Sequence, residues 1–186
     1  MSYASLSEVK RYLGITSADD DALLNSLILA SKKIIDNVTN RTFAASSDTI
    51  RYYGADAVDG MTLYFDADQC DIEKVTNGDG VIVASTKYTT RPRNASPYFA
   101  IVLDDDSAVS WDTDSGEIAV EGRWAWSITP PDDIVHACVR LTAYLYRQKD
   151  NASDLDRTII AGNSALLPSE LPRDVLLLLS PYKRRT

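Results

Sequence analysis

Apolar residues recur at steps of three and four between positions 19 and 40. This spacing is the period of one helix face and predicts a helix of about 20 residues. The aspartates at 19–21 suit a helix start, where unpaired N–H groups and the helix dipole favour negative charge. The predicted inner face consists of Leu24, Leu27, Ile28, Ser31, Ile34, Ile35 and Val38. Because the stretch holds no catalytic residue type beyond ordinary carboxylates and lysines, we interpret it as the scaffold of the chain.

Three further helices are predicted around this scaffold. Residues 5–13 begin with Ser5 and Glu8 at capping-box spacing, and Gly14 ends the helix. A longer helix extends to about residue 148, with Thr129 as the predicted N-cap and two prolines in its first turn. Its broad apolar face includes Ile134, Cys138, Leu141 and Leu145. A short helix over 172–179 is apolar on every side, so it must be covered by its own core or by another chain.

The pattern between residues 49 and 126 is different. Short β-branched and aromatic runs alternate with turn signals, which is typical of strands. The sequence from Asn77 to Gly80 predicts a hairpin, because asparagine and glycine tolerate positive φ. The candidate strands are residues 49–53, 61–65, 72–76, 81–84, 98–103 and 117–121.

These elements predict an α+β protein. We expect a helical bundle core of two N-terminal and two C-terminal helices, with a small antiparallel β unit inserted between them. The expected parts are 1–43, 44–128 and 129–186, forming one structural domain with an insertion. Residues 149–169 are polar and are predicted to form a loop.

Composition limits the possible functions. The chain has 186 residues, 45% of them hydrophobic, and 19 basic against 27 acidic side chains give a net charge of −8. An acidic protein is a poor candidate for wrapping nucleic acid, although it can line a passage through which DNA slides. No apolar run reaches the length of a membrane span, and the N-terminus lacks the features of a signal peptide. We therefore expect no membrane association. Because Cys70 and Cys138 lie too far apart in the sequence to indicate a disulfide scaffold, we expect the compartment to be a reducing cytoplasm.

Candidate chemistry is sparse. His136 is the only histidine, no nucleophile elbow is present, and Cys70 and Cys138 lie far apart, so neither a catalytic triad nor a zinc site is expected. The acidic turn at Asp112 and Asp114 lacks the spacing of a calcium loop. The three tryptophans are expected in a core or an interface rather than in a ligand platform. We predict that the protein is not an enzyme and needs no cofactor.

Four blocks of sequence, taken in order, resemble the head–tail connector proteins of tailed bacteriophages, also called adaptor or head-completion proteins. The first is Ser-Leu-Ser-Glu-Val-Lys-Arg-Tyr-Leu-Gly at 5–14. The second is the 20–36 helix followed by Asn-Arg-Thr-Phe at 40–43. The others are Pro-Pro-Asp-Asp-Ile-Val-His-Ala-Cys-Val-Arg-Leu at 130–141 and Leu-Leu-Ser-Pro-Tyr-Lys-Arg-Arg at 178–185. The β-type middle resembles the insertion of the longer members.

This resemblance implies a structural role in the virion. Family members form a ring, typically of twelve subunits, beneath the portal, where the ring extends the DNA channel and meets a stopper or tail-completion protein. The DNA would pass through without specific binding. The family's C-terminal segment commonly engages the portal, which here corresponds to Leu171, Val175, Leu176, Leu178, Leu179, Tyr182, Lys183, Arg184 and Arg185. The residues expected in the subunit core or interface are Leu24, Leu27, Ile28, Ile34, Ile35, Ile134, Cys138, Leu141 and Leu145.

Two alternatives remain open at this stage. One is a nucleic-acid-binding regulator that uses the N-terminal helical pair. Its second helix, however, starts with aspartates that would face phosphates with the wrong sign. The other is a hydrolase or carbohydrate binder built on the tryptophan-rich β unit, for which the sequence offers no identifiable nucleophile or base.

Overall fold

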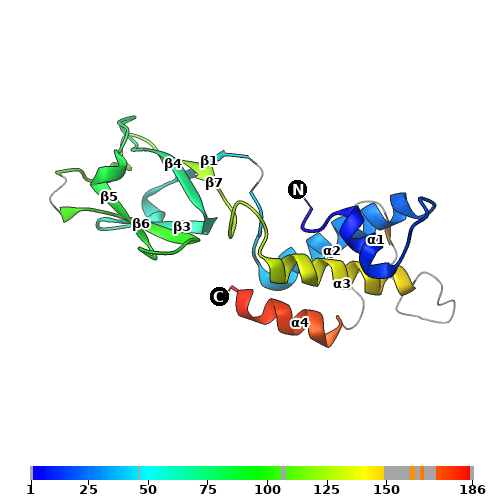
Figure 1. Ribbon diagram of the computed structural model, residues 1–186. Coiled ribbons are helices and arrows are strands. Elements are labelled where there is room, and N and C mark those ends of the chain that lie inside the picture. The colour runs from blue at the N-terminus through cyan, green and yellow to red at the C-terminus, as the bar shows by residue number, and fades with distance from the viewer. Residues whose placement is uncertain are drawn as a thin grey trace. The chain divides into compact units, whose positions relative to one another are not determined.

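The computed structural model describes residues 2–45, 47–105, 108–148, 160–161, 164–165 and 171–184. The Cα positions divide into two compact units. The first, here called the helical unit, combines Met1–Arg41 with Pro130–Thr186, and the second, the β unit, is Thr42–Thr129. Figure 1 shows the helices in the first unit and the strands β1 to β7 in the second.

Helix α1 (Leu6–Leu13) begins and ends where local chemistry requires. The Ser5 hydroxyl accepts a hydrogen bond from the Glu8 N–H, and the Glu8 carboxylate accepts one from the Ser5 N–H at 2.7 Å, which completes a capping box. The Ser5 hydroxyl also donates to the Glu8 carboxylate at 2.6 Å. This bond and the one from the Ser5 N–H lower the pKa of Glu8 below its ordinary value, because they favour the charged carboxylate. Gly14 ends the helix in the left-handed conformation, at φ 71°.

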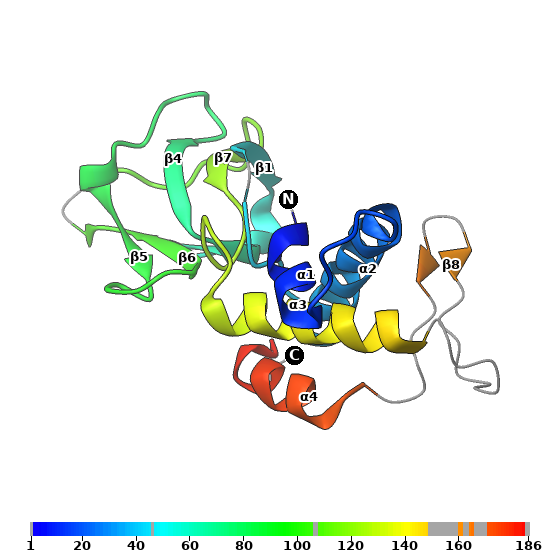
Figure 2. The same ribbon diagram turned by 45° about the vertical axis from the view of Figure 1, so that its right-hand side comes forward.

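Helices α2 (Asp21–Thr39) and α3 (Asp132–Arg147) bury their apolar faces in the helical unit. Both helices lie close together in Figures 1 and 2. A buried hydrogen bond of 2.9 Å joins the hydroxyls of Thr142 on α3 and Ser31 on α2. Since both side chains are fully buried, this polar pair is satisfied inside the core and fixes the register of the two helices.

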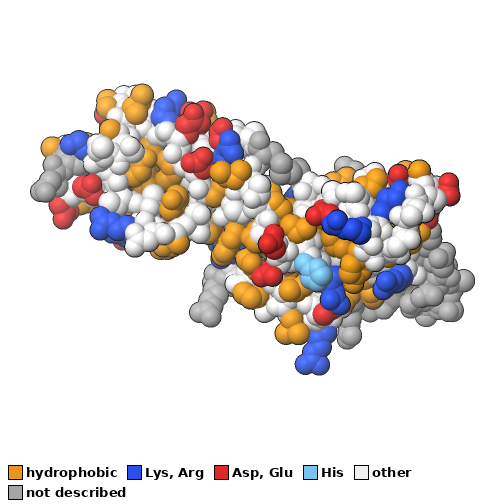
Figure 3. Space-filling view, viewed as in Figure 1, with side chains coloured by type: hydrophobic (Ala, Val, Ile, Leu, Met, Phe, Trp, Pro, Cys, Tyr) orange, Lys and Arg blue, Asp and Glu red, His pale blue; other side chains and the backbone are white. Residues whose placement is uncertain are grey.

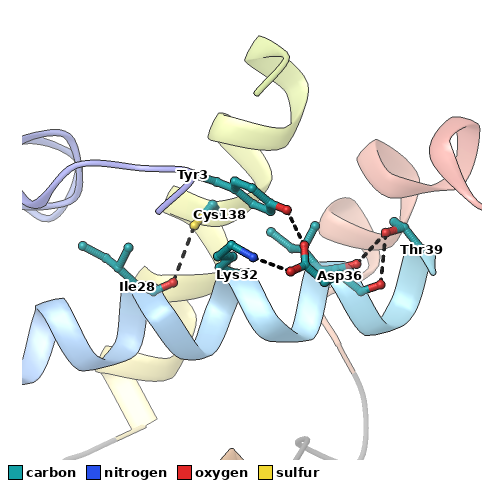
Figure 4. Close-up of polar contacts among 7 residues, drawn as sticks. Tyr3, Ile28, Lys32, Asp36, Thr39 and Cys138 are labelled. Atoms are coloured by element: carbon teal, nitrogen blue, oxygen red, sulfur yellow. Dashed lines mark hydrogen bonds and ion pairs between the residues drawn. The ribbon is translucent and has the colours of Figure 1, made fainter. Parts of the chain in front are cut away.

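A second polar cluster anchors the start of the chain to α2. The Tyr3 hydroxyl donates to Asp36, which also pairs with Lys32 one turn earlier, and the Lys32 ammonium lies 4.8 Å from the centroid of the Tyr3 ring. Figure 4 shows the three side chains converging. It also shows the Cys138 thiol directed at the carbonyl oxygen of Ile28, 4.0 Å away. Burial raises the pKa of Cys138 to about 12, so this thiol is neutral at physiological pH.

Helix α4 (Arg173–Leu179) packs against α3 and, more narrowly, α2. It begins after Pro172 and is followed by a 3₁₀ turn, Ser180–Tyr182. Between α3 and α4 the described residues include a ribbon of two short strands, β8 (Ile160–Ala161) and β9 (Ser164–Ala165). The predicted loop over 149–169 otherwise lies outside the described residues.

The β unit contains two antiparallel sheets. The order in the first is β1 (Thr49–Tyr53), β7 (Ile118–Arg123) and β4 (Asp71–Thr76). The order in the second is β2 (Val58–Asp59), β3 (Thr62–Gln69), β6 (Tyr98–Leu103) and β5 (Tyr88–Arg91). Two 3₁₀ turns, Ala55–Ala57 and Ser85–Lys87, connect strands of this unit.

The β unit has its own hydrophobic core. Strand alternation turns one residue in two inward, and Leu63 of β3 pairs with Ile101 of β6, both fully buried. The core cluster comprises Tyr53, Leu63, Phe65, Val75, Val83, Ile101, Leu103, Ile118, Val120 and Trp124. Every member lies between Thr42 and Thr129, so this cluster needs no residue of the helices.

Hydrogen bonds join two loops of the β unit, the turn at Asn77 to Gly80 and the loop at 110–112. The Asn77 side chain donates to the Ser110 carbonyl and accepts from the Asp112 N–H, each at 2.9 Å, while the Gly78 N–H donates to the Asp112 carbonyl. A Cβ on Gly78 would lie 2.2 Å from the Asp112 oxygen, so only glycine fits here. The turn at Asn77 to Gly80 is therefore held from both sides.

The fold differs from the prediction in its core. The expected helical bundle core is wrong: the protein is mixed α+β, and its seven principal strands form two antiparallel sheets. The physical reason is the amount of apolar surface in the middle of the chain, which is enough to close a core between two sheets. In the helical unit, α1 and α4 are only 8 and 7 residues long and cover the α2–α3 pair rather than completing a bundle of equal helices.

Local corrections are smaller. The expected strand over 81–84 is wrong, because only the isolated bridge between Thr76 and Ile82 forms there. Thr129 is not the N-cap of α3, which begins after Pro131. Strands β2 and β5 were not predicted. Both are short, and β5 lies in a polar run without alternation.

Candidate docking surfaces

The residues predicted for the subunit core or interface all lie inside the helical unit. Each of them is no more than 4% exposed. They come from the facing sides of α2 and α3, where they fill the space between the helices. On α2, the large apolar side chain that does face solvent is Leu29, which is 60% exposed and was not among the predicted residues.

Helix α4 has an inner and an outer side. Val175 and Leu179 are fully buried, whereas Leu176 is 36% and Leu177 is 65% exposed. Positions 175 and 179 are four residues apart and therefore share one helix face. Leu176 and Leu177 lie on the opposite, exposed side of the helix. We call Leu176 and Leu177 the outer face of α4. Figure 2 shows α4 alongside α3.

Polar contacts hold this helix and the following turn on the unit. Arg140 of α3 pairs with Asp174 in the first turn of α4. The Arg41 side chain donates to the Tyr182 carbonyl at 2.7 Å, and the Arg184 N–H donates to the Thr39 carbonyl at 3.0 Å. These bonds connect the last described residues to the end of α2.

The Tyr182 hydroxyl lies 3.4 Å from the Asp133 carboxylate at the start of α3 and donates to it. Partial burial and this carboxylate raise the pKa of Tyr182, so the hydroxyl stays protonated. The ring is half-buried, while Lys183 is exposed. Of the other predicted docking residues, Leu171 and Leu178 are half-buried, and Arg185 lies outside the described residues.

A hollow beside His136 has no catalytic constellation. Its volume is about 420 Å³, and it is lined by residues of α1 and α3, namely Glu8, Arg11, Tyr12, Asp132, Val135, His136 and Val139. None of these is a serine, threonine or cysteine that the imidazole could activate. In the described part of the chain no cluster of histidine, cysteine and carboxylate side chains could hold a metal ion.

The same described residues contain no helix long and apolar enough to cross a membrane.

The Asp112 carboxylate in the acidic turn is engaged by hydrogen bonds from neighbouring residues of the same turn. It accepts hydrogen bonds from the Asp114 and Ser115 N–H groups and from the Ser115 hydroxyl, and those from Ser115 lower its pKa the most. The turn is therefore structural.

A model of the head completion protein family matches residues 3–185. The chain belongs to this family. The resemblance drawn from the order of the sequence blocks is confirmed, and the function of this head completion protein is that of a structural head–tail adaptor. No observation supports the alternative of a nucleic-acid-binding regulator, and no curated protein sequence matches the chain.

Solved structures share the fold of this head completion protein. A chain in the neck of an empty gene transfer agent (GTA) particle, computed with C6 symmetry, is 15% identical, with a TM-score of 0.64 over 99% of this chain and 91% of that one. A chain in the virion of the native GTA particle is 18% identical, with a TM-score of 0.61 over the same shares. A third, in the native neck computed with C12 symmetry, is 15% identical, with a TM-score of 0.57 over 99% and 90%.

Sequence reasoning about this head completion protein missed several exposed apolar side chains. Besides Leu29 and Leu177, the β unit exposes tyrosines on two strands, Tyr52 of β1 at 61% and Tyr64 of β3 at 47%. Strand alternation could have found Tyr52, because its neighbour Tyr53 turns inward. Hydrophobic side chains gather on the visible surface of both units in Figure 3.

Two of the three tryptophans pack in the core of the β unit or against it. Trp124 is part of the core cluster, and its Nε1 donates to the Thr49 carbonyl at 3.0 Å. Trp111 is half-buried against the same cluster and donates to the Met61 carbonyl at 2.9 Å. With both indole N–H groups satisfied internally, these rings serve packing rather than ligand binding.

Proposed function

We propose that this head completion protein forms a ring at the head–tail junction of the virion, with the outer face of α4 docked on the portal. The observation that carries the proposal is the exposure of Leu176 and Leu177 on a helix whose opposite side is fully buried. Exposed large apolar side chains on a surface helix are typical of protein interfaces.

Charge completes this docking surface. Lys183 is exposed beside the 3₁₀ turn that follows α4, and Arg184 and Arg185 continue the basic run. The rest of the chain is acidic overall, since the net charge is −8 even with these residues included. An apolar patch with a basic rim fits an apolar groove bordered by carboxylates, which is the chemistry we assign to the portal partner.

Twelve copies are the proposed number. The structural relatives come from particle necks computed with C6 and C12 symmetry, which supports a cyclic assembly. A ring needs two different faces on each subunit that meet head to tail and close by rotation. The far side of the ring would meet a stopper or tail-completion protein, and DNA would pass through an acidic channel without specific binding. Assembly would take place in the host cytoplasm, without enzymatic turnover or a cofactor.

The docking test replaces Leu177 by aspartate. Leu29→Asp is the matched control, because the two leucines are similarly exposed, at 65% and 60%, and neither change disturbs a core. We expect L177D to weaken binding to purified portal rings roughly tenfold or more, since a charge cannot enter a desolvated contact. L29D should bind the portal as the unmodified protein does. Equal binding by L177D, or by a protein lacking residues 171–186, would show that α4 is not the docking element.

Ring formation and DNA passage need separate measurements. Light scattering of the protein with portal should give a mass consistent with twelve copies for each portal, and electron microscopy should show the ring. A mobility-shift titration at low salt should show no complex with duplex DNA. A salt-sensitive complex would contradict the proposed passive channel.

A further inference from the structure

The β unit contains a groove that none of the roles above uses. Its volume is about 360 Å³, within the range of about 300–1,000 Å³ typical of ligand pockets. It lies between the end of β1, the following 3₁₀ turn and the middle of β3. The lining consists of Tyr52, Tyr53, Gly54, Asp56, Ala57, Tyr64, Phe65 and Asp66, and we call it the tyrosine groove.

Aromatic rings form the apolar part of the groove. Tyr53 and Phe65 are each 6% exposed and belong to the core cluster, with ring centroids 5.7 Å apart. Both also contact Trp124, at 6.0 Å and 5.2 Å between ring centroids. These inner rings are therefore fixed by packing. Tyr52 and Tyr64 contribute the two solvent-exposed rings of the groove.

Two carboxylates supply the charge. Asp66 accepts hydrogen bonds from the Tyr53 hydroxyl at 2.9 Å and from Arg51 at 2.7 Å. Burial opposes the charged form, but these two hydrogen bonds outweigh it and lower the pKa of Asp66. Asp56 forms no ion pair among the described residues, and its Oδ1 lies next to Gly54, 3.1 Å from where a Cβ would be.

The lining contains no lysine or arginine. Arg51, which lies beside the groove, neutralises at most one of the two carboxylates, so the groove keeps a negative charge. Such a surface repels phosphate and carboxylate ligands and attracts cations. Aromatic faces attract cations too, through the negative charge above the ring.

Arg51 shows how a cation is held at this place. Its guanidinium lies 4.8 Å from the centroid of the Trp124 ring while it pairs with Asp66. The same combination of an aromatic face and a carboxylate recurs in the groove with Tyr52, Tyr64 and Asp56, and no lysine or arginine among the described residues lines it.

We propose that the tyrosine groove binds an arginine or lysine side chain from a basic segment of a different protein of the particle neck. This inference rests on the proposed position of the chain in the neck, because that position supplies a neighbour. The cation would lie against the exposed tyrosine rings and pair with Asp56. Tyrosine and arginine are among the residues that contribute most to binding at protein interfaces.

The experiment uses the full-length protein and two synthetic peptides. One has the sequence acetyl-Gly-Ser-Arg-Gly-Arg-Ser-amide, and the other carries citrulline, which is neutral and nearly isosteric, in place of both arginines. Peptide binding is followed by NMR shifts of the tyrosine ring protons. We expect saturable shifts at Tyr52 and Tyr64, at least tenfold tighter binding of the arginine peptide, and weaker binding as salt increases.

Three variants locate the site. Tyr52→Ala removes one exposed ring and should weaken arginine-peptide binding roughly threefold to thirtyfold. Asp56→Asn removes the charge at nearly constant size and should act in the same direction. Ile50→Ala is the matched control, because Ile50 lies two residues earlier on β1, is 46% exposed and does not line the groove.

Several outcomes would overturn the proposal. These are the absence of saturable shifts, equal binding of the citrulline peptide, or equal loss in I50A. Tighter binding of a peptide with the chain's own residues 178–186 would assign the groove to a second copy instead of a different protein. The groove and the portal contact are tested separately: L177D would leave peptide binding intact, and Y52A would leave portal docking intact, so failure of one does not decide the other.

Discussion

The helical unit and the β unit stabilise themselves in different ways. In the helical unit, the ends of α1 are satisfied by neighbouring residues, such as Ser5 with Glu8, and the two long helices pack through continuous apolar faces. In the β unit, closure depends on contacts between distant residues, such as Asn77 with Asp112 and Leu63 with Ile101. Helix ends can therefore be predicted from neighbouring residues, whereas the closure of the sheets depends on which distant segments of the chain meet.

The two units also place their exposed apolar residues differently. In the helical unit Leu176 and Leu177 adjoin each other on one short helix. In the β unit the exposed tyrosines come from strands of different sheets. The apolar character of a single short helix is visible in the sequence, while a surface built from two sheets is not.

The strongest test of this comparison truncates each core. Ile101→Ala in the β unit and Leu141→Ala in the helical unit both remove fully buried atoms, and each should cost about 2–5 kcal/mol of unfolding free energy. We expect I101A to lower hydrogen-exchange protection mainly in β3 and β6, and L141A mainly in α2 and α3. Each variant serves as the control for the other. Equal loss of protection in both units from either change would contradict separate cores.

A substitution at Gly78, where two loops of the β unit meet, should lower the free energy of unfolding by a smaller amount. Gly78→Ala forces a Cβ to within 2.2 Å and 2.3 Å of two carbonyl oxygens, those of Asp112 and Gly116, and should destabilise the β unit by about 1–3 kcal/mol. Chemical denaturation followed by tryptophan fluorescence measures this, because all three tryptophans lie in this unit.

Gly80→Ala is the matched control for the loop. Gly80 has φ 82°, so alanine is strained there, but nothing lies within 4 Å of its Cβ position. We expect a cost of about 1 kcal/mol from the backbone alone. A loss in G78A no greater than in G80A would show that the contact with the second loop is unimportant.

The smallest expected effect is in the cap of α1. Ser5→Ala removes the hydroxyl that accepts from the Glu8 N–H, which should cost about 1 kcal/mol. The folded-state pKa of Glu8 is lowered chiefly by hydrogen bonds from Ser5, so its stabilising contribution is present above the unfolded value of 4.5 and is lost as pH falls through the folded value.

In S5A the NMR-measured pKa of Glu8 should therefore rise toward 4.5 and the acid-side loss of stability should shrink. Ser26→Ala on α2 is the control, since the exposed Ser26 hydroxyl donates to the Ala22 carbonyl and lies outside the cap of α1. An unchanged Glu8 pKa in S5A would mean that the backbone hydrogen bond alone sets it.

Much of the fold was predictable from local pattern. Helix α2 lies within the predicted stretch 19–40, and strands β1 and β6 have the predicted bounds. The division of the core was not predictable, because it depends on how Leu63, Ile101 and Val120 meet between sheets. Strand pairing is set by which residues lie opposite each other, and a linear pattern does not specify the partner.

Residues a few positions apart set the helix faces, the cap at Ser5, the turn at Asn77 and the apolar character of residues 175–179, so these features can be read from the sequence. The burial of Val175 and Leu179 beside an exposed Leu177 became known from the folded chain, as did the groove that Tyr52 and Tyr64 share with Asp56. Burial and charge pairing depend on the neighbours that folding brings together. These neighbours are often far apart along the chain, and their separation in the sequence does not show that they will be in contact.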